Sequence, residues 1–119
     1  SDAGLIPMFL PDYQPVSDDG VRSAFTEVWQ SSDFSDKKGL TVTEIMDAVH
    51  DGDIRSLYVL GENPAMSDPD VEHARAALAK LDHLVVQDIF LTETACFADV
   101  ILPASAFAEK SGTVTNTNR

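Results

Sequence analysis

Apolar positions recur at helical spacing in two segments of the first half of the chain. Between residues 18 and 30 they fall three or four positions apart, on one face of a predicted helix: Val21, Ala24, Phe25, Val28 and Trp29. A second helix is predicted to start at Thr41 and to end near Gly52, because Thr41 and Glu44 have the spacing of a capping box before a further apolar stripe. The polar stretch 31–39 between the two helices is predicted to be a loop.

The second half of the chain alternates short apolar runs with helical segments. The runs are rich in strand-forming residues and end at polar or turn-forming residues: Ser56–Leu60, Leu84–Gln87 and Val100–Leu102. Asp68 before Pro69 is predicted to cap a helix between the first two runs, and a shorter helical segment is expected at 92–98. The alternation predicts an α/β fold: a three-layer, Rossmann-like open parallel sheet of few strands, covered by helices.

The chain has 119 residues, which is enough for one hydrophobic core, so a single domain over 1–119 is predicted. Its lead-in, residues 1–16, holds three prolines and is expected to be extended and packed rather than helical. Residues 105–119 complete neither a helix nor a strand, so we expect an incomplete C-terminal segment and a chain that is a piece of something larger.

Charge and composition exclude several classes of function. The 8 basic and 20 acidic residues give a formal net charge of −12, which repels nucleic acids and anionic membranes. No apolar run has the roughly 20 residues that a membrane helix needs, and the N-terminus lacks the pattern of a signal peptide. The single cysteine, Cys96, excludes an internal disulfide and agrees with a reducing compartment, so a cytoplasmic location is expected.

Ligands of open parallel sheets bind outside the carboxyl ends of the strands, and three such ends are predicted here. Gly61 would allow a positive φ or a close approach of the backbone to a ligand, and Asn63 before Pro64 would form a turn with a free side-chain amide. An ordinary strand-to-helix turn explains these residues equally well. Neither a GxxxxGK[ST] loop nor a GxGxxG fingerprint is present, so ATP and NAD have no specific support in this chain.

Asp88 is the residue at these strand ends that points most directly to a ligand. A carboxylate there can accept two hydrogen bonds from the adjacent ring and exocyclic N–H donors of guanine. The alternative is a cap for the helical segment that follows, and by spacing alone this alternative is the more common one.

No catalytic or metal-ligating set is predicted within the chain. Cys96 lies among apolar neighbours with no histidine near it in sequence, so it is expected to be a buried structural thiol rather than a nucleophile. The three histidines are too scattered for a metal site: His50, His73 and His83. Capping or solvation explains the acidic residues of the central segment: Glu62, Asp68 and Asp70.

Several strings of the sequence match a known family. GENPAMSDPD at 61–70, QDIFLTET, ADVILP and EKSGTVTN within 85–119, and PDYQPVSDDGVR at 11–22 occur in this order. With these strings the chain resembles the molybdopterin oxidoreductases, and most closely the catalytic alpha subunit of NAD-dependent formate dehydrogenases. The resemblance implies a cofactor of molybdenum or tungsten held by two pterin dithiolenes, each bearing a guanine nucleotide: bis(molybdopterin guanine dinucleotide).

The resemblance also implies roles for particular residues. By matching motifs, Gly61 and Asn63 resemble the turn that packs on the nucleotide, Gln87 and Asp88 the pair that reads its sugar or guanine, and Lys110 a further cofactor contact. The family's metal-ligating cysteine or selenocysteine, the histidine after it and the cysteines of its iron–sulfur clusters do not occur here, and Cys96 matches none of them. Formate oxidation is therefore expected of a longer parent chain, and the fragment itself is expected to be inactive.

The partners implied are the rest of the parent catalytic subunit and the iron–sulfur and flavin subunits of a diaphorase. Two other hypotheses stay open. The first is the same domain in an enzyme for nitrate or another small oxyanion, and the second is a stand-alone, non-catalytic binding module.

Overall fold

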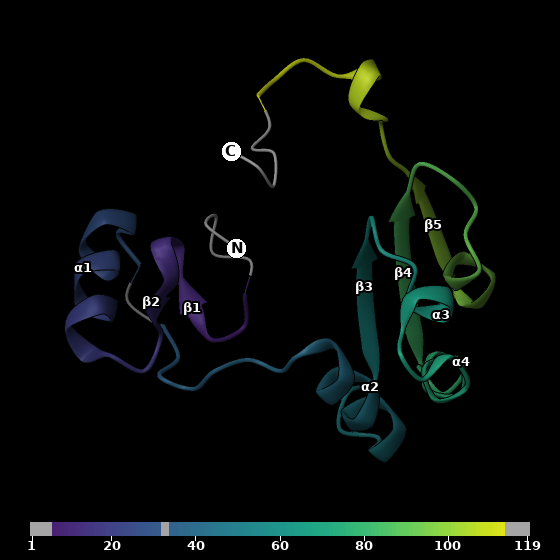
Figure 1. Cartoon of the computed structure of the whole chain (residues 1–119), viewed down its shortest axis with the longest axis horizontal. Coiled ribbons are helices and arrows are strands. Elements are labelled where there is room, and N and C mark those ends of the chain that lie inside the picture. Colours follow the sequence, from purple (N-terminus) through teal and green to yellow (C-terminus); the bar gives the residue numbers. More distant parts are fainter. Residues whose placement is uncertain (1–5, 32–33, 114–119) are drawn as a thin grey trace. The chain divides into compact units, whose positions relative to one another are not determined.

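The computed structural model describes residues 6–31 and 34–113 and divides the chain after Glu44 into two compact units (Figure 1). The prediction of one domain over 1–119 stays a prediction.

The first unit opens with a small antiparallel pair. Strands β1 (Phe9–Leu10) and β2 (Gln14–Pro15) are joined by the 3₁₀ turn η1 (Pro11–Tyr13). Pairing is short because prolines lack the N–H that a longer ladder would need. The lead-in predicted to be extended thus folds back on itself over its described part.

Helix α1 (Asp19–Trp29) follows and confirms the helix predicted over 18–30. Asp18 caps it, since its Oδ1 accepts a hydrogen bond from the backbone N–H of Val21 at 3.0 Å. All 11 residues of α1 are described and none is buried. The ring of Trp29 lies edge-to-face between those of Phe25 and Phe34, with centroids 5.0 and 5.4 Å away.

The second unit is built on a three-stranded parallel sheet. Its strands β3 (Ser56–Leu60), β4 (His83–Asp88) and β5 (Val100–Pro103) stand in the order β3-β4-β5 (Figure 1). The α/β class and the open parallel sheet are therefore confirmed. Among the described residues no helix is long and apolar enough to cross a membrane.

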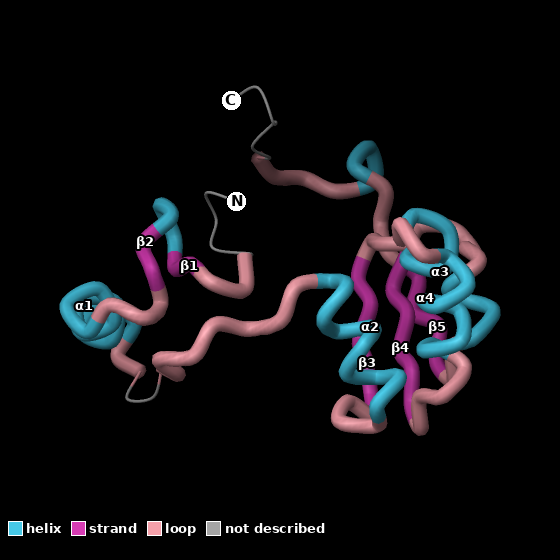
Figure 2. The backbone as a smooth tube through the Cα atoms, turned by 60° about the horizontal axis from the view of Figure 1, so that its bottom comes forward, coloured by secondary structure: helices cyan, strands magenta, loops and turns pink. Residues whose placement is uncertain are grey.

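Helices cover one face of this sheet. Figure 2 shows α2 (Val42–Asp51), α3 (Pro64–Ser67) and α4 (Val71–Leu78) along the same side of the strands. They bury one core with alternate residues of β4 and the 3₁₀ turn η2 (Thr94–Phe97): Met46, Val49, Ala65, Ala74, Ala77, Leu78, Leu84, Val86 and Ala95. Both crossovers lie on the same side, as right-handed connections require when strands follow one another in order.

The other face of the sheet carries exposed apolar side chains. Tyr58 and Leu60 of β3 are 55% and 61% exposed, and Val100 and Leu102 of β5 are each 39% exposed. The register aligns them, because Tyr58 pairs with Val85, which pairs with Val100. We call these four residues the open face. A second helical layer, expected from the alternation, is not formed by the described residues of this unit.

The helix predicted to start at Asp68 begins two residues later. Pro64–Ser67 forms a helical turn of its own, α3, and α4 starts after Asp70, whose Oδ1 accepts from the N–H of His73 at 3.1 Å. Asp68 is buried, and its Oδ1 accepts from the N–H of Asp70 at 3.0 Å. This local turn occupies the side chain that was predicted to cap, so the cap at Asp68 is wrong.

The remaining predictions differ from the structure mainly at element boundaries. Helix α2 confirms the predicted second helix, and the N–H and hydroxyl of Thr41 both donate to Glu44 Oε2 at 2.7 Å. The helical segment expected at 92–98 is the four-residue turn η2. The C-terminal segment contains the turn η3 (Phe107–Glu109), and residues 114–119 lie outside the described part.

Candidate functional site

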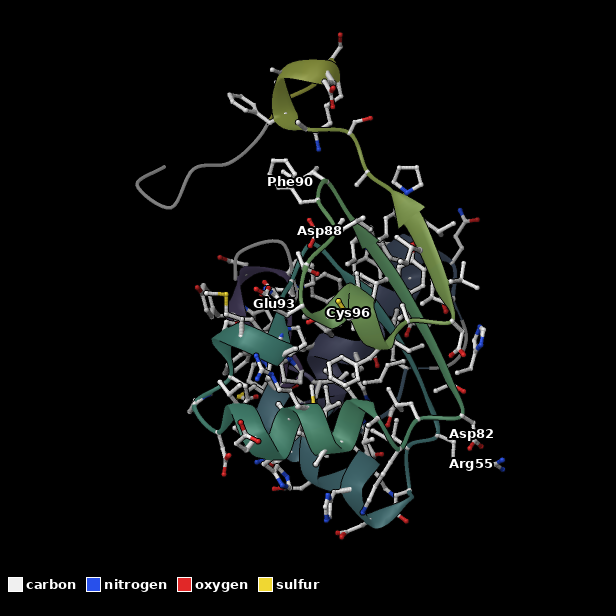
Figure 3. All side chains as sticks on the ribbon, turned by 90° about the vertical axis from the view of Figure 1, so that its right-hand side faces the viewer. Arg55, Asp82, Asp88, Phe90, Glu93 and Cys96 are labelled. Atoms are coloured by element: carbon white, nitrogen blue, oxygen red, sulfur yellow. The ribbon has the colours of Figure 1, made fainter. Side chains whose placement is uncertain are left out.

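The carboxyl ends of β3, β4 and β5 meet at one edge of the sheet. Figure 3 shows Asp88 and Phe90 at this edge, and Arg55 and Asp82 at the opposite edge, where they form an exposed ion pair. Because the strands are parallel, the turns that follow them come together at this edge. Four of the five predicted site residues lie on these strand ends and turns; Lys110 lies beyond η3.

Gly61 is held in a conformation that favours glycine. Its N–H donates to the carbonyl oxygen of Gln87 at 2.9 Å, and its φ is +64°. A Cβ at this position would meet no described atom within 4 Å. Glycine is therefore favoured here by the backbone angle and not by crowding, and the space beside it is open to a close approach.

Asn63 does not have the free side-chain amide that was predicted. Its Oδ1 accepts from the N–H of Thr94 at 3.1 Å and from the Thr94 hydroxyl at 2.8 Å. Its Nδ2 donates to Glu93 Oε2 at 2.7 Å. Thr94 is buried and needs partners for its polar atoms, and the neighbouring turn supplies them.

Gln87 and Asp88 lie on opposite faces of the sheet, because successive side chains of a strand alternate. Gln87 shares the open face with Tyr58, whose hydroxyl donates to Gln87 Oε1. Asp88 lies on the helix-covered side with Leu84 and Val86. The two residues therefore flank the end of β4 and do not form a pair on one side.

The carboxylate of Asp88 is half-buried and bonded only locally. Its Oδ1 accepts from the N–H of Ile89 at 2.7 Å, and its Oδ2 has no hydrogen-bond partner among the described residues. The next helical turn begins only at Thr94, so Asp88 is not the helix cap that spacing favoured. The backbone of Asp88 also anchors the end of β5, since its carbonyl oxygen accepts from Ala104 at 3.0 Å.

Lys110 directly follows η3 and is exposed. It lines a hollow with residues of the same C-terminal segment: Phe107, Ser111, Gly112 and Thr113. Within the described residues, no hydrogen bond or ion pair joins Lys110 to the other predicted site residues.

The residues that the sequence reasoning missed are Glu93 and Thr94. The hydrogen bond from the Asn63 amide, together with one from Glu93's own backbone, holds the pKa of Glu93 below its ordinary value. The sequence shows the polar residues Thr92-Glu93-Thr94 after the second predicted strand, but nothing in it pairs them with Asn63, because that contact depends on the pairing of β3 with β4.

The family model described as Molybdopterin oxidoreductase matches residues 9–119 of this chain. The chain belongs to the molybdopterin oxidoreductase family.

Relatives within this family agree with that assignment. The F420-dependent formate dehydrogenase subunit alpha of Methanocaldococcus jannaschii is 52% identical over 118 residues, 99% of this chain and 17% of that subunit. The F420-dependent formate dehydrogenase 2 subunit alpha of Methanococcus maripaludis is 42% identical over 118 residues, with the same shares. A Bacillus subtilis protein described as a probable oxidoreductase is 45% identical over 119 residues, 100% of this chain and 12% of its own length. The chain therefore spans less than a fifth of the length of each of these relatives.

The family implies a molybdopterin cofactor with molybdenum or tungsten, and the strand ends offer such a ligand open space and an acceptor oxygen. Gly61 leaves open space beside the backbone, and Asp88 presents a carboxylate oxygen without a protein partner among the described residues.

In the described ranges no group of three or more His, Cys, Asp or Glu side chains could hold a metal ion. His50 and His73 do meet across α2 and α4, with ring centroids 5.0 Å apart, and His73 lies 2.9 Å from Asp47.

Cys96 is exposed, so the prediction of a buried thiol is wrong. It belongs to the short turn η2, and its Sγ–H donates to the carbonyl oxygen of Thr92 at 3.7 Å. In η2 the buried positions are Thr94 and Ala95, so the side chain of Cys96 points away from the core although its sequence neighbours are apolar.

Proposed function

We propose that this chain is the part of a molybdenum- or tungsten-dependent formate dehydrogenase that holds one guanine nucleotide end of bis(molybdopterin guanine dinucleotide). When bound, that cofactor supplies the two-electron oxidation of formate to carbon dioxide. The residues of this chain bind and orient its nucleotide and take no part in the chemistry. The names of the archaeal relatives support formate as the substrate.

The observation that carries the proposal is the carboxylate of Asp88 at the carboxyl end of the central strand. It is half-buried, and Oδ2 makes no hydrogen bond within the described residues. Guanine offers adjacent N–H donors on its ring and exocyclic nitrogens, which a carboxylate accepts in pairs. Partial burial strengthens such hydrogen bonds because fewer waters compete for the same oxygens.

The remaining site residues have roles that suit the other parts of the nucleotide. Open space beside Gly61 lets the nucleotide lie against the backbone of the β3–α3 turn. Gln87, on the other side of β4, can bond to the sugar through its amide, and Lys110 offers a cation to a phosphate or a base oxygen. Asn63 acts on the turn itself, since protein groups occupy its side-chain oxygen.

The principal partner in this proposal is the rest of the same catalytic subunit, which would cover the open face. Parallel sheets are almost always buried on both faces, and the open face exposes Tyr58, Leu60, Val100 and Leu102. For electrons, the resemblance favours NAD through iron–sulfur and flavin diaphorase subunits, whereas F420 appears in the name of the Methanocaldococcus relative. We assign the enzyme to the cytoplasm, where an exposed thiol such as Cys96 stays reduced.

The experiment uses the full-length protein that contains this chain. Purified enzyme is assayed for formate oxidation with viologen, NAD and F420 as acceptors, and its guanine nucleotide and metal are quantified. The variant Asp88→Ala should lower the guanine nucleotide content and the metal content of the purified enzyme together. Hydrogen bonds to a charged group contribute about 1.5–3 kcal/mol, so cofactor retention should fall roughly tenfold to a hundredfold.

The matched control is Asp82→Ala, which removes the same charge at the opposite end of β4. It should leave nucleotide and metal contents unchanged. Equal contents in the wild type and Asp88→Ala would contradict the role of Asp88. Turnover of nitrate without turnover of formate would overturn the assignment to formate.

A further inference from the structure

Three residues tie together the turns that follow β3 and β4. Asn63 Oδ1 accepts two hydrogen bonds from Thr94, through its N–H and its hydroxyl, and Asn63 Nδ2 donates to Glu93. The Thr94 oxygen in turn accepts from the N–H of Ala65 at 3.1 Å. We call Asn63, Glu93 and Thr94 the bracket. It joins positions about 30 residues apart in the sequence.

The bracket satisfies groups that would otherwise be unpaired inside the protein. Thr94 and Ala65 are both fully buried. The N–H of Ala65 lies in the first turn of α3, where a helix has no partner of its own for its N–H groups. The Thr94 hydroxyl supplies that partner and simultaneously donates to Asn63, so one hydroxyl joins both turns.

Charge sets the orientation of the Asn63 amide. A carboxylate can only accept hydrogen bonds, so the NH₂ group of Asn63 must face Glu93 and the oxygen must face Thr94. The hydrogen bond from Asn63 lowers the pKa of Glu93, and the nearby Arg75 guanidinium acts in the same direction. Glu93 is therefore ionised at neutral pH, and the amide has one favoured orientation.

The same side chain of Asn63 belongs to the turn that begins at Gly61. The carbonyl oxygen of Asn63 accepts from Met66 and Ser67, both at 2.9 Å, so the residue is held by its main chain as well. The other end of the bracket follows Asp88 by five and six residues, across the exposed segment Ile89–Leu91. Gly61 and Asp88 thus border the candidate site, and the bracket connects the two turns that begin at these residues.

We propose that the bracket is a positioning device that fixes the β3–α3 turn against the β4–η2 turn before the nucleotide binds. Thr94 and Glu93 are then positioning residues: they act through Asn63 and make no contact with the ligand themselves. This inference rests on the proposed function. A preformed site binds more tightly because ordering the two turns does not have to be repeated on binding.

The experiment uses the full-length enzyme and measures how fast guanine nucleotide is lost during dilution, with KM, kcat per bound metal and thermal stability measured alongside. Thr94→Val keeps the branched shape and removes the hydroxyl, which leaves the N–H of Ala65 without its acceptor and leaves Asn63 Oδ1 with only the backbone N–H of Thr94 as a donor. We expect nucleotide retention to fall roughly tenfold. KM for formate and kcat per bound metal should not change, because the bracket touches neither substrate nor metal.

Thr94→Ser should restore retention to within about twofold of the wild type, since it keeps the hydroxyl that carries both hydrogen bonds. Glu93→Ala is a second variant whose folding is not at risk, because Glu93 is exposed. It removes the acceptor of Asn63 Nδ2 and leaves only the two bonds from Thr94 to hold the amide, so retention should fall several-fold. Thr92→Val, on the same turn but outside the bracket, is the matched control: it removes a hydroxyl that accepts from the N–H of Ala95 at 3.4 Å, and that N–H keeps the carbonyl oxygen of Thr92 as its acceptor at 3.0 Å. Thr92→Val should retain nucleotide like the wild type.

Two outcomes would overturn the inference in distinguishable ways. If Asp88→Ala lowers retention while Thr94→Val and Glu93→Ala change only thermal stability, the nucleotide site stands and the bracket has no positioning role. If Asp88→Ala, Thr94→Val and Glu93→Ala all leave nucleotide retention unchanged, the proposed nucleotide site is wrong. The positioning role of the bracket is then wrong as well.

Discussion

The N–H of Gly61 donates to the carbonyl oxygen of Gln87 at 2.9 Å, one residue beyond the last paired residue of β3. This hydrogen bond extends the β3–β4 pairing into the turn and is made with a φ of +64° at Gly61. The chain leaves the sheet at this point and turns back toward α3, directly beside the carboxyl end of β4.

The first prediction concerns this backbone angle. Gly61→Ala should lower the free energy of unfolding of the 119-residue chain by about 1 kcal/mol, because a Cβ disfavours the left-handed region. Crowding adds nothing, since a Cβ would meet no described atom within 4 Å. Urea unfolding followed by circular dichroism measures the change. Gly61→Asn should lose less, because asparagine adopts this region more readily, and equal stability of Gly61→Ala and the wild type would show that the angle is not needed.

The second prediction tests the one-sided core of the sheet. Leu84 is 1% exposed and Leu60 is 61% exposed. Leu84→Ala should lower the free energy of unfolding of the 119-residue chain by about 2–5 kcal/mol, whereas Leu60→Ala should change it by less than about 0.5 kcal/mol. Circular dichroism is the suitable probe, because the single tryptophan, Trp29, lies in the first unit.

The same pair of variants also tests whether the open face is covered in the parent protein. There, Leu60→Ala should become clearly destabilising, since the rest of the subunit would bury Leu60. A Leu60→Ala variant of the full-length protein that unfolds like the wild type would argue against that partner.

The third prediction concerns pH and the start of α2. The N–H and hydroxyl of Thr41 donate to Glu44 and hold the pKa of Glu44 below its ordinary value. A carboxyl whose pKa is lowered by folding stabilises the fold above its unfolded pKa, and this contribution is lost as pH falls through the folded pKa. The stability of the wild type should therefore fall more steeply between neutral pH and pH 3 than that of Glu44→Gln.

The control for this pH dependence is Glu72→Gln in the first turn of α4, where the carboxylate makes no hydrogen bond within the described residues. The free energy of unfolding of Glu72→Gln should change with pH in nearly the same way as that of the wild type, whereas that of Glu44→Gln should not. Parallel curves for the wild type and Glu44→Gln would mean that the bonds from Thr41 do not favour the charged carboxyl.

The fourth prediction concerns the thiol. Because Cys96 is exposed, a disulfide reagent such as DTNB should titrate one thiol per 119-residue chain without denaturant. Cys96→Ser should abolish the reaction and leave the circular dichroism spectrum unchanged. A thiol that reacts only after unfolding would contradict this prediction and would mean that Cys96 is buried, as its apolar neighbours in the sequence suggested.

The sequence was most informative where neighbours along the chain decide the outcome. Helical spacing predicted α1, and short apolar runs predicted all three strands of the sheet. The start of α4 was misplaced because Asp68 and Asp70 both have the residue type of a cap. Only the turn made by Asp68 onto Asp70 decides between them.

The candidate site divides in the same way. Its location at the strand ends follows from the alternation of helices and strands, and the residues that match family motifs could be named from the sequence. The partner of Asn63 could not, because Thr94 lies 31 positions away and reaches it only through the pairing of β3 with β4. The exposure of Cys96 depends on which side of η2 meets the core.

Local periodicity and turn residues thus determined the fold class and the strand ends. Tertiary structure decided which strand faces are covered, which side of β4 each of Gln87 and Asp88 occupies, and which polar groups tie the two turns together. The physical reason is the distance along the chain over which each kind of interaction acts. Backbone preferences and side-chain alternation act over a few residues, whereas a hydrogen bond such as that between Asn63 and Thr94 exists only after the sheet has brought distant turns side by side.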